Sequence, residues 1–303
     1  MYNGIINIYK EKGFTSHDVV AKMRGILRQK KIGHTGTLDP DATGVLPVCL
    51  GSATKLCDML TDRDKEYEAV MQLGISTDTQ DLSGEVLKEC PVTVTEEEAR
   101  NAILSFIGDY DQIPPMYSAL KVNGKKLYEL ARAGKEVERQ PRAVTIYDIT
   151  ILDMKLPEVT FRVFCSKGTY IRTLCYDIGV KCGCLAAMKS LKRIKAGVFR
   201  EESAITLAEL EKLRDEERVG EVVVPVDHFF VELAPVHIPD EFIKYIKNGN
   251  SFYPQQIKER IGFGDGEDVR VYDEAGRFYG VYTMKQQEGR FVPKKMFLEN
   301  DLK

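Results

Sequence analysis

The spacing of hydrophobic residues along the first part of this chain changes from a strand-like run to a helical repeat. The apolar run at residues 4–10 predicts a strand. A helix is expected next, with Thr15 or Ser16 as its N-cap. The apolar residues that share one face of this helix are Val19, Val20, Met23, Ile26 and Leu27. The chain therefore begins with a strand followed by an amphipathic helix.

Strand and helix patterns continue to alternate through the middle of the chain. Further strands are predicted at residues 45–50, 67–74, 144–154 and 159–165, the last two as a hairpin rich in β-branched residues. Helices are predicted at residues 53–60, 95–107, 170–181 and 207–218, with Thr95 and Glu98 as a capping box. Because strands and helices do not follow a strict βαβ repeat, the pattern indicates an α+β fold.

The pattern changes again towards the end of the chain. Short strand candidates at residues 269–272, 278–282 and 290–293 are separated by glycines, which is typical of a small β-rich module. A boundary is expected within residues 222–238, where prolines bracket a short connection. We therefore predict two units, residues 1–228 and residues 229–303.

The composition is that of an ordinary globular protein, with 43% hydrophobic and 29% charged residues among 303. No run of eighteen apolar residues occurs, so we expect neither a membrane span nor a signal peptide. The seven cysteines are an odd number and are scattered through apolar segments, which favours reduced thiols over disulfides. Cys182 and Cys184 have no second pair or histidine cluster nearby in the sequence, so zinc is disfavoured.

The distribution of charge says more than the net charge of −3. Lysine and arginine are concentrated in three segments, residues 22–31, 121–142 and 181–200, whereas acidic residues crowd between 201 and 221. Such segments are often merely solvated surfaces. Three of them in one chain also fit a polyanionic partner such as a nucleic acid, and both interpretations stay open at this point.

Residues 31–44 carry the candidate chemistry. Three glycines allow this polar segment to turn tightly and approach a ligand, and Pro40 restricts the conformation of Asp39 before it. A phosphate-binding P-loop is disfavoured because the Gly-Lys-Ser/Thr ending is missing. Asp39 and Asp41 alone are weak evidence for a magnesium site. A bare Asp-Pro pair would most simply be a turn cap, so the residues alone leave the role of Asp39 open.

The whole segment, Lys31-Ile-Gly-His-Thr-Gly-Thr-Leu-Asp-Pro-Asp-Ala-Thr-Gly44, closely resembles the catalytic loop of the TruB family of pseudouridine synthases. The resemblance implies that Asp39 is the essential catalytic residue. It extends to Lys65-Glu66-Tyr67, where Tyr67 is implied to stack on the target base, although a tyrosine in a strand is ordinarily a core residue.

Two later motifs extend the resemblance. In Cys165–Leu174 the resemblance implies that Arg172 pairs with the catalytic aspartate, and a bidentate guanidinium would keep that carboxylate ionised. Leu191, in Leu191-Lys192-Arg193, is implied to help wall the pocket. In such an enzyme the target base must leave its stacked position in the RNA and enter the pocket. Tyr170 and His34 are expected to replace the stacking that the base loses, although a lone loop histidine is more often a simple hydrogen-bonding residue.

Residues 111–140 resemble the insertion, called the thumb, that closes on the RNA in this family. We expect basic side chains of the insertion and of the first basic segment to contact phosphates. These candidate RNA-binding residues are Lys121, Lys125, Lys126, Arg132, Arg24, Arg28 and Lys31. The implied fold is a mixed, largely antiparallel central sheet with flanking helices, followed by a PUA-like RNA-binding module at residues 229–303.

The resemblance implies a stand-alone enzyme that converts the T-loop uridine of tRNA to pseudouridine. It further implies no cofactor, no metal, no membrane association, no obligate protein partner, a monomer, and a cytoplasmic location. Whether Asp39 attacks C1′ or C6 or acts as a base is left open. The alternatives are a guide-RNA-dependent synthase of the H/ACA type and a catalytically silent RNA-binding or tRNA-folding protein.

Overall fold

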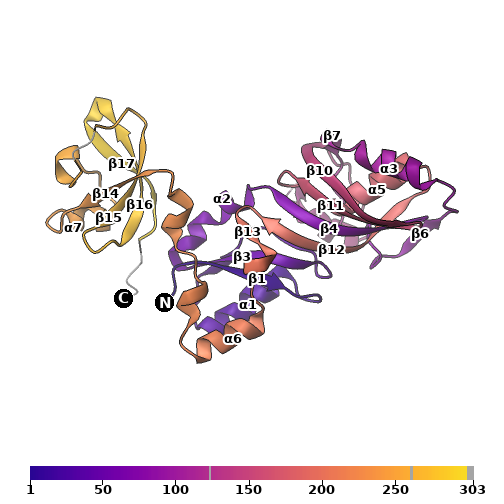
Figure 1. Ribbon diagram of the computed structural model, residues 1–303, viewed down its shortest axis with the longest axis horizontal. Coiled ribbons are helices and arrows are strands. Elements are labelled where there is room, and N and C mark those ends of the chain that lie inside the picture. The colour runs from indigo at the N-terminus through magenta and orange to yellow at the C-terminus, as the bar shows by residue number, and fades with distance from the viewer. Residues whose placement is uncertain (123, 260–261, 299–303) are drawn as a thin grey trace.

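The computed structural model describes residues 1–122, 124–259 and 262–298. The molecule is elongated, with a large sheet and its helices in one body and a smaller β-rich module beside it (Figure 1). The N-terminus lies near the junction of the two bodies. The α+β architecture expected from the sequence is therefore observed.

A nine-stranded mixed sheet organises the larger body. Its main strands follow the order β1 (Gly4–Lys10), β3 (Thr43–Leu50), β12 (Ala186–Ala196), β4 (Lys65–Leu73), β11 (Glu158–Cys165), β10 (Arg142–Lys155) and β7 (Gly108–Gln112). Short strands β2 (Ile32–His34) and β13 (Phe199–Arg200) pair with β3 and β12. Only β3 and β12 run parallel to each other; the remaining described pairs in this sheet are antiparallel, which confirms the predicted sheet type.

Helices cover the sheet in two groups, each with its own core. Helices α1 (Ser16–Leu27) and α6 (Leu207–Asp215) pack on β1, β2 and β3. Helices α3 (Glu96–Leu104) and α5 (Ile171–Lys181) pack against β4, β10, β11 and β12. Helix α1 starts with a capping box between Thr15 and Asp18 and buries the apolar face predicted from its spacing.

Several short elements connect these layers. A 3₁₀ turn (Gly51–Leu56) runs into α2 (Cys57–Thr61), so the helix predicted at residues 53–60 is divided between two helix types. Strands β5 (Ile75–Thr77) and β6 (Val86–Glu89) form a hairpin that was not predicted. The insertion holds β8 (Lys121–Val122), β9 (Lys125–Lys126) and α4 (Leu127–Arg132).

The central strand β12 and the edge strand β7 were not predicted. In β12, register shifts near Ser190 and between Arg193 and Lys195 change which face a side chain meets, so its sequence shows no simple alternation. Strand β7 pairs only with β10 among the described strands, and its Gly-Asp-Tyr-Asp-Gln sequence lacks an apolar run. Both strands form because their neighbours supply the hydrogen bonds.

The smaller body is a four-stranded sheet in the order β14 (Ala234–Ile238), β15 (Asp268–Asp273), β16 (Phe278–Lys285) and β17 (Arg290–Met296), with helix α7 (Ile243–Lys247) beside it. The three predicted strands correspond to β15, β16 and β17. Strand β14 was missed because it lies at the edge of the sheet, where a proline such as Pro235 is tolerated. The module has its own core around Val271, Tyr282 and Phe291.

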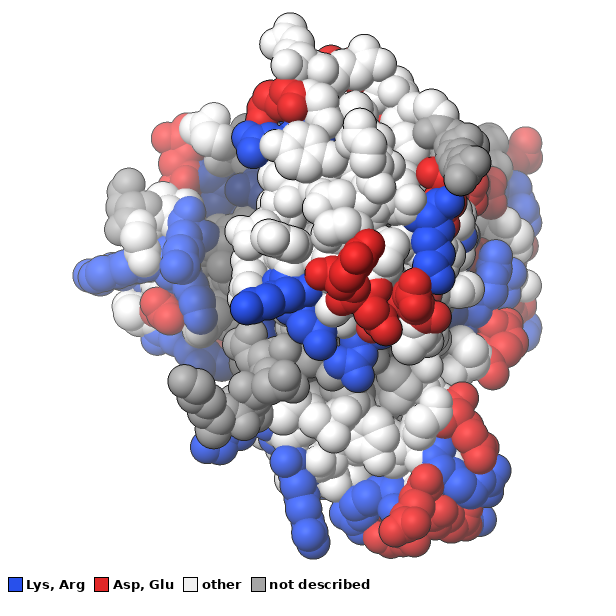
Figure 2. Space-filling view, turned by 90° about the vertical axis from the view of Figure 1, so that its left-hand side faces the viewer, with Lys and Arg blue, Asp and Glu red and all other residues white. Residues whose placement is uncertain are grey.

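Seen from the end that carries this module, the surface mixes acidic and basic side chains around a broad uncharged area (Figure 2). No single sign of charge dominates this view.

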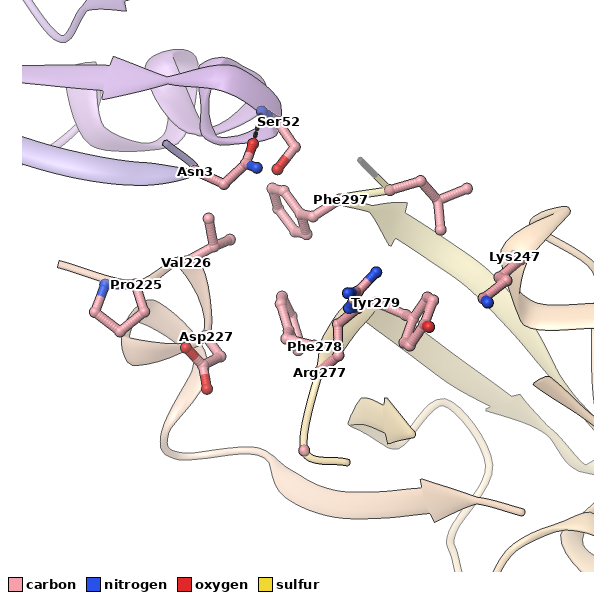
Figure 3. A pocket seen from close by; sticks show the side chains of 12 residues that line it. Asn3, Ser52, Pro225, Val226, Asp227, Lys247, Arg277, Phe278, Tyr279 and Phe297 are labelled. Carbon is pink, nitrogen blue, oxygen red and sulfur yellow. Dashed lines mark hydrogen bonds between the residues drawn. The ribbon is translucent and has the colours of Figure 1, made fainter. Parts of the chain in front are cut away.

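The two bodies meet around a cavity of about 430 Å³ (Figure 3). Ser52 comes from the larger body, Val226 from the connecting segment, and Phe278 and Phe297 from the module. Phe297 also belongs to a core cluster that includes Ile5 and residues of the connection. The module is thus packed against the sheet body through buried apolar contacts. No helix among the described residues is both long and apolar enough to cross a membrane.

Candidate active site

The segment that carries Asp39 is fixed to its surroundings at several points. The backbone N–H of Leu38 donates to Ser16 Oγ at 2.9 Å, and the Ala42 N–H donates to the Asp39 carbonyl at 3.1 Å. The buried ammonium of Lys10 donates to the Pro40 carbonyl at 2.9 Å. Helix α1 and strand β1 therefore hold this loop rigidly, while the Asp39 side chain keeps 38% of its surface exposed.

Arg172, in the first turn of α5, forms a two-point contact with Asp39. Its Nε lies 2.9 Å from Asp39 Oδ2, and its Nη2 donates to Asp39 Oδ1 at 3.2 Å. The guanidinium is itself fixed, because it donates to the carbonyls of Thr79 and Tyr117, each at 2.9 Å. The side chain is only 6% exposed. The structure thus places together the two residues that the sequence resemblance paired.

The environment tunes the acidity of Asp39. Burial raises the pKa of this carboxyl above its ordinary value, and the charge of Arg172 opposes that rise. The carboxylate of Asp81 raises the pKa further. Asp39 is therefore a more basic carboxylate than a solvated aspartate, and Arg172 favours its ionised form. That combination suits a residue that attacks a carbon or removes a proton.

Asp81 was not selected from the sequence. Its Oδ2 lies 3.8 Å from Arg172 Nη1, whereas Arg172 Nε and Nη2 contact Asp39. Thr79 and Ser83 both donate hydroxyl hydrogen bonds to Asp81 Oδ1. The signal available in the sequence was a run of mostly polar residues at 76–84, whose aspartates could have been considered as partners for an arginine.

Three of the other predicted pocket residues lie on β4, on β12 and at the start of α5. Tyr67 on β4 is only 9% exposed and belongs to the same core cluster as Leu38; Leu191 on β12 packs against that cluster. The backbone of Tyr170 is held by Gln112, which accepts from its N–H at 2.7 Å and donates to its carbonyl at 3.0 Å. Burial raises the pKa of both phenols, and the charge of Asp39 also reaches both.

His34 is the last residue of β2 and lies within the segment that resembles the catalytic loop. Its ring meets the ring of His17 edge-on, with 5.3 Å between centroids. Burial lowers the pKa of His34 to about 4, and the charges of His17 and Arg193 add to this effect. Among the described residues, His34 Nδ1 has no hydrogen-bond partner. His34 is therefore a neutral, planar side chain near neutral pH.

This half-buried histidine predicts a pH-dependent stability. Its pKa falls from 6.5 to about 4 on folding, so its contribution is fully present above pH 6.5 and is lost as the pH falls towards 4. We expect His34→Asn to lose less unfolding free energy over this interval than the parent, by about 1 kcal/mol after allowing for partial solvent exposure. Urea titrations at several pH values measure this; parallel curves for both proteins would contradict it.

The basic residues of the insertion form a local cluster. Lys121 and Lys126 face each other across the β8–β9 hairpin, and Lys125 is exposed beside them. The ring of Tyr128 lies beneath two cations, with Lys126 Nζ 5.3 Å and the Arg132 guanidinium carbon 5.5 Å from its centroid. This arrangement keeps several positive charges close together on the insertion.

The other two basic segments differ from this cluster. Arg24 donates to the carbonyls of Lys30 and Ile32, so it shapes the turn after α1, whereas Arg28 and Lys31 are exposed. In the segment at residues 181–200, Lys192 is paired with Glu68 and Glu201, and Arg193 is buried. These two residues therefore do not add to a basic surface, because the fold pairs Lys192 with acids from other segments and removes Arg193 from solvent.

No group of three or more histidine, cysteine, aspartate or glutamate side chains is placed to bind a metal within residues 1–122, 124–259 and 262–298. Asp41 instead lies 4.0 Å from Lys12 at the surface.

Comparison with protein families places this site in a known context. Residues 24–171 match the model of the TruB family pseudouridylate synthase N-terminal domain. Residues 172–231 match the tRNA pseudouridylate synthase B C-terminal domain, and residues 234–297 match the C-terminal model of pseudouridine synthase II TruB. The three matches together span most of the chain.

Individual relatives agree with these matches. The chain is 52% identical to tRNA pseudouridine synthase B of Lachnoclostridium phytofermentans, covering 98% of this chain and 100% of the relative. It is 49% identical to the protein of the same name from Alkaliphilus oremlandii, covering 94% of each. A chain of a solved H/ACA RNP bound to a substrate RNA containing 2′-deoxyuridine is 28% identical, with a TM-score of 0.69 over 98% of this chain and 86% of that one. The chain belongs to the TruB family of pseudouridine synthases.

Proposed function

We propose that this chain is a tRNA pseudouridine synthase that isomerises the T-loop uridine, with Asp39 as the essential carboxylate. The observation that carries the proposal is the two-point contact between Asp39 and the buried Arg172. Full-length relatives named tRNA pseudouridine synthase B support the substrate. The fixed guanidinium holds the carboxylate in one orientation, which favours reaction at a defined atom.

The reaction breaks the bond between uracil N1 and ribose C1′, turns the base within the pocket, and forms a bond between C5 and C1′. The C5 proton is lost and N1 gains one, so atoms and electrons balance without an external oxidant or energy source. In this proposal Asp39 is the group that acts on the sugar or the base. A T-loop base must leave its stack to reach it, at a cost of a few kcal/mol. In this proposal the rings of Tyr67, Tyr170 and His34 stack on the base and offset that cost.

We further propose a role for each part of the chain. Residues 1–228 form the catalytic domain, and residues 229–303 form a PUA-like RNA-binding module. Residues 111–140 form an insertion that closes on the RNA; the hydrogen bond from Arg172 to the Tyr117 carbonyl supports a link between this insertion and the site. A monomer without an obligate protein partner, acting on tRNA in the cytoplasm, is the simplest arrangement consistent with a site built from one chain.

A guide-RNA-dependent synthase is the second candidate, and the similarity to a chain of an H/ACA RNP is the observation that favours it. Identity to that chain is 28%, however, against 52% for a relative named tRNA pseudouridine synthase B. A catalytically silent RNA-binding protein would not require the Asp39–Arg172 contact. The higher identity to the relative named tRNA pseudouridine synthase B and the presence of the Asp39–Arg172 contact both favour the stand-alone enzyme.

Incubation of the purified chain with an unmodified tRNA transcript tests the function directly. Pseudouridine should form at the T-loop uridine without any added protein or guide RNA, and a transcript with cytidine at that position should remain unmodified. Product formed only after a guide RNA is added would favour the second candidate. Stable binding without any product would favour the silent RNA-binding protein.

The basic cluster on the insertion predicts a salt effect. Replacing Lys125 and Lys126 together by glutamine removes two charges that can neutralise phosphates. We expect weaker tRNA binding and a slope of log affinity against log salt that is shallower by roughly one to two units. The rate at saturating RNA should change much less, because both residues lie outside the pocket.

A matched control for this experiment replaces the exposed Lys155 and Lys212 by glutamine. These lysines pair with Asp153 and Glu216 on β10 and α6, outside the three basic segments. The control should keep the parent slope. An unchanged slope in the Lys125/Lys126 variant would show that the insertion is an ordinary solvated surface.

A further inference from the structure

A fully enclosed arginine lies in the middle of the central sheet. Arg193 on β12 is 1% exposed and is among the largest fully buried side chains of the described residues. In the sheet register it lies opposite Tyr67 on β4 and beside Gly44 on β3. It therefore occupies the strand position between the proposed base-stacking residue and the end of the catalytic loop.

The guanidinium of Arg193 contacts the backbone on both sides of Asp39. Its Nε donates to the Val45 carbonyl at 2.7 Å, and its Nη2 donates to the Gly36 carbonyl at 3.2 Å. Asp39 lies between these two anchor points in the chain. One planar side chain thus joins a backbone position before Asp39 to one after it.

The backbone of Arg193 packs closely against Gly44, the last residue of the catalytic loop. Gly44 has a φ of +102°, and a Cβ there would lie 2.2 Å from the Arg193 carbonyl oxygen. Strands β3 and β12 can therefore approach this closely only with glycine at residue 44. The loop end is held by backbone packing on one side and by the guanidinium on the other.

Arg193 also interacts with the Tyr67 side chain. The two residues are direct neighbours across strands β12 and β4, and the positive charge of Arg193 opposes the rise in the pKa of Tyr67 that burial causes. No ion pair joins Arg193 to an acidic side chain among the residues that the structure describes. A buried cation without a carboxylate costs folding free energy, which calls for a compensating role.

We propose that Arg193 is a positioning residue for the reaction: it holds the catalytic loop and the Tyr67 ring in a fixed relative position around the flipped uracil. The inference rests on the proposed function and adds a residue to it. Arg172 fixes the Asp39 carboxylate itself, whereas Arg193 fixes the backbone on both sides of Asp39 and the ring across from it. The two arginines therefore act on different parts of one site.

The test compares Arg193→Met and Arg193→Lys with Arg162→Met as the matched control. Arg162 lies on the neighbouring strand β11 and pairs with Glu66 and Glu68, away from the loop. Under single-turnover conditions with saturating tRNA, we expect Arg193→Met to slow pseudouridine formation about 100-fold while its RNA dissociation constant stays near that of the parent. Arg193→Lys keeps the charge and should fold if the methionine variant does not, yet remain slower than the parent because it loses the planar fork.

A spectroscopic measurement separates positioning from a general loss of stability. The ¹³Cζ resonance of Tyr67 in tyrosine-labelled protein, assigned with Tyr67→Phe, should shift in both Arg193 variants and stay unchanged in Arg162→Met. The rate effects of Arg193→Lys and Tyr67→Phe should also be less than additive when combined, because both changes break the same contact.

Three results would overturn the inference: a chemical step within threefold of the parent in Arg193→Lys, a fall in rate fully explained by weaker RNA binding, or strict additivity together with an unchanged Tyr67 resonance. Failure of the proposed function is distinguishable from these. In that case the parent chain itself forms no pseudouridine, while the Tyr67 resonance still reports whether Arg193 positions the ring.

Discussion

Replacement of Asp39 by asparagine should abolish pseudouridine formation while tRNA affinity stays within several-fold of the parent. The amide keeps the size of the carboxylate but loses its negative charge, its nucleophilicity and its basicity. We expect the single-turnover rate to fall by at least about a thousandfold, as when an essential covalent or acid–base group is removed. Pseudouridine mapping of a T-stem-loop RNA measures the rate, and filter binding measures the affinity.

Asp41→Asn is the matched control for this prediction. Asp41 is an exposed aspartate two residues away that lies near Lys12 rather than Arg172. It should retain substantial activity. Turnover by Asp39→Asn above about one percent of the parent rate would show that Asp39 is not the essential group. Equal loss in both variants would point to a role shared by the pair.

The second large effect concerns Arg172. Arg172→Lys keeps a positive charge but cannot contact both oxygens of Asp39 while donating to the carbonyls of Thr79 and Tyr117. We expect the chemical step to slow about 100-fold, since a misplaced carboxylate loses the geometry of attack. The dissociation constant for RNA should change little, because the arginine side chain is 6% exposed and faces the protein interior.

The pH dependence of the rate gives an independent measurement on this variant. Arg172 lowers the pKa of Asp39 against the effect of burial, so a weaker contact should raise that pKa. Activity requires the ionised carboxylate, and the acid limb of the profile should therefore move to higher pH in Arg172→Lys. Weaker RNA binding with normal turnover at saturation would instead assign Arg172 to the phosphate-binding surface.

Local sequence was sufficient for the elements with regular patterns. The apolar face of α1 and its capping residue, and the β-branched hairpin of β10 and β11, follow from interactions between residues close in the chain. Strands β7, β12 and β14 were missed because their pairing depends on neighbours that are distant in sequence. In β12 the two register shifts also remove the alternation by which a strand is recognised.

The sequence by itself determined the family and the identity of the candidate catalytic residue, since fourteen consecutive residues around Asp39 form a recognisable motif. Only the tertiary structure decided what surrounds that carboxylate. Arg172 is 133 residues away in the chain, and its contact with Asp39 requires α5 to pack against the sheet. Asp81 and the buried Arg193 reach the site in the same way. Charge, burial and pKa depend on distances in space, so spacing along the chain could not supply them.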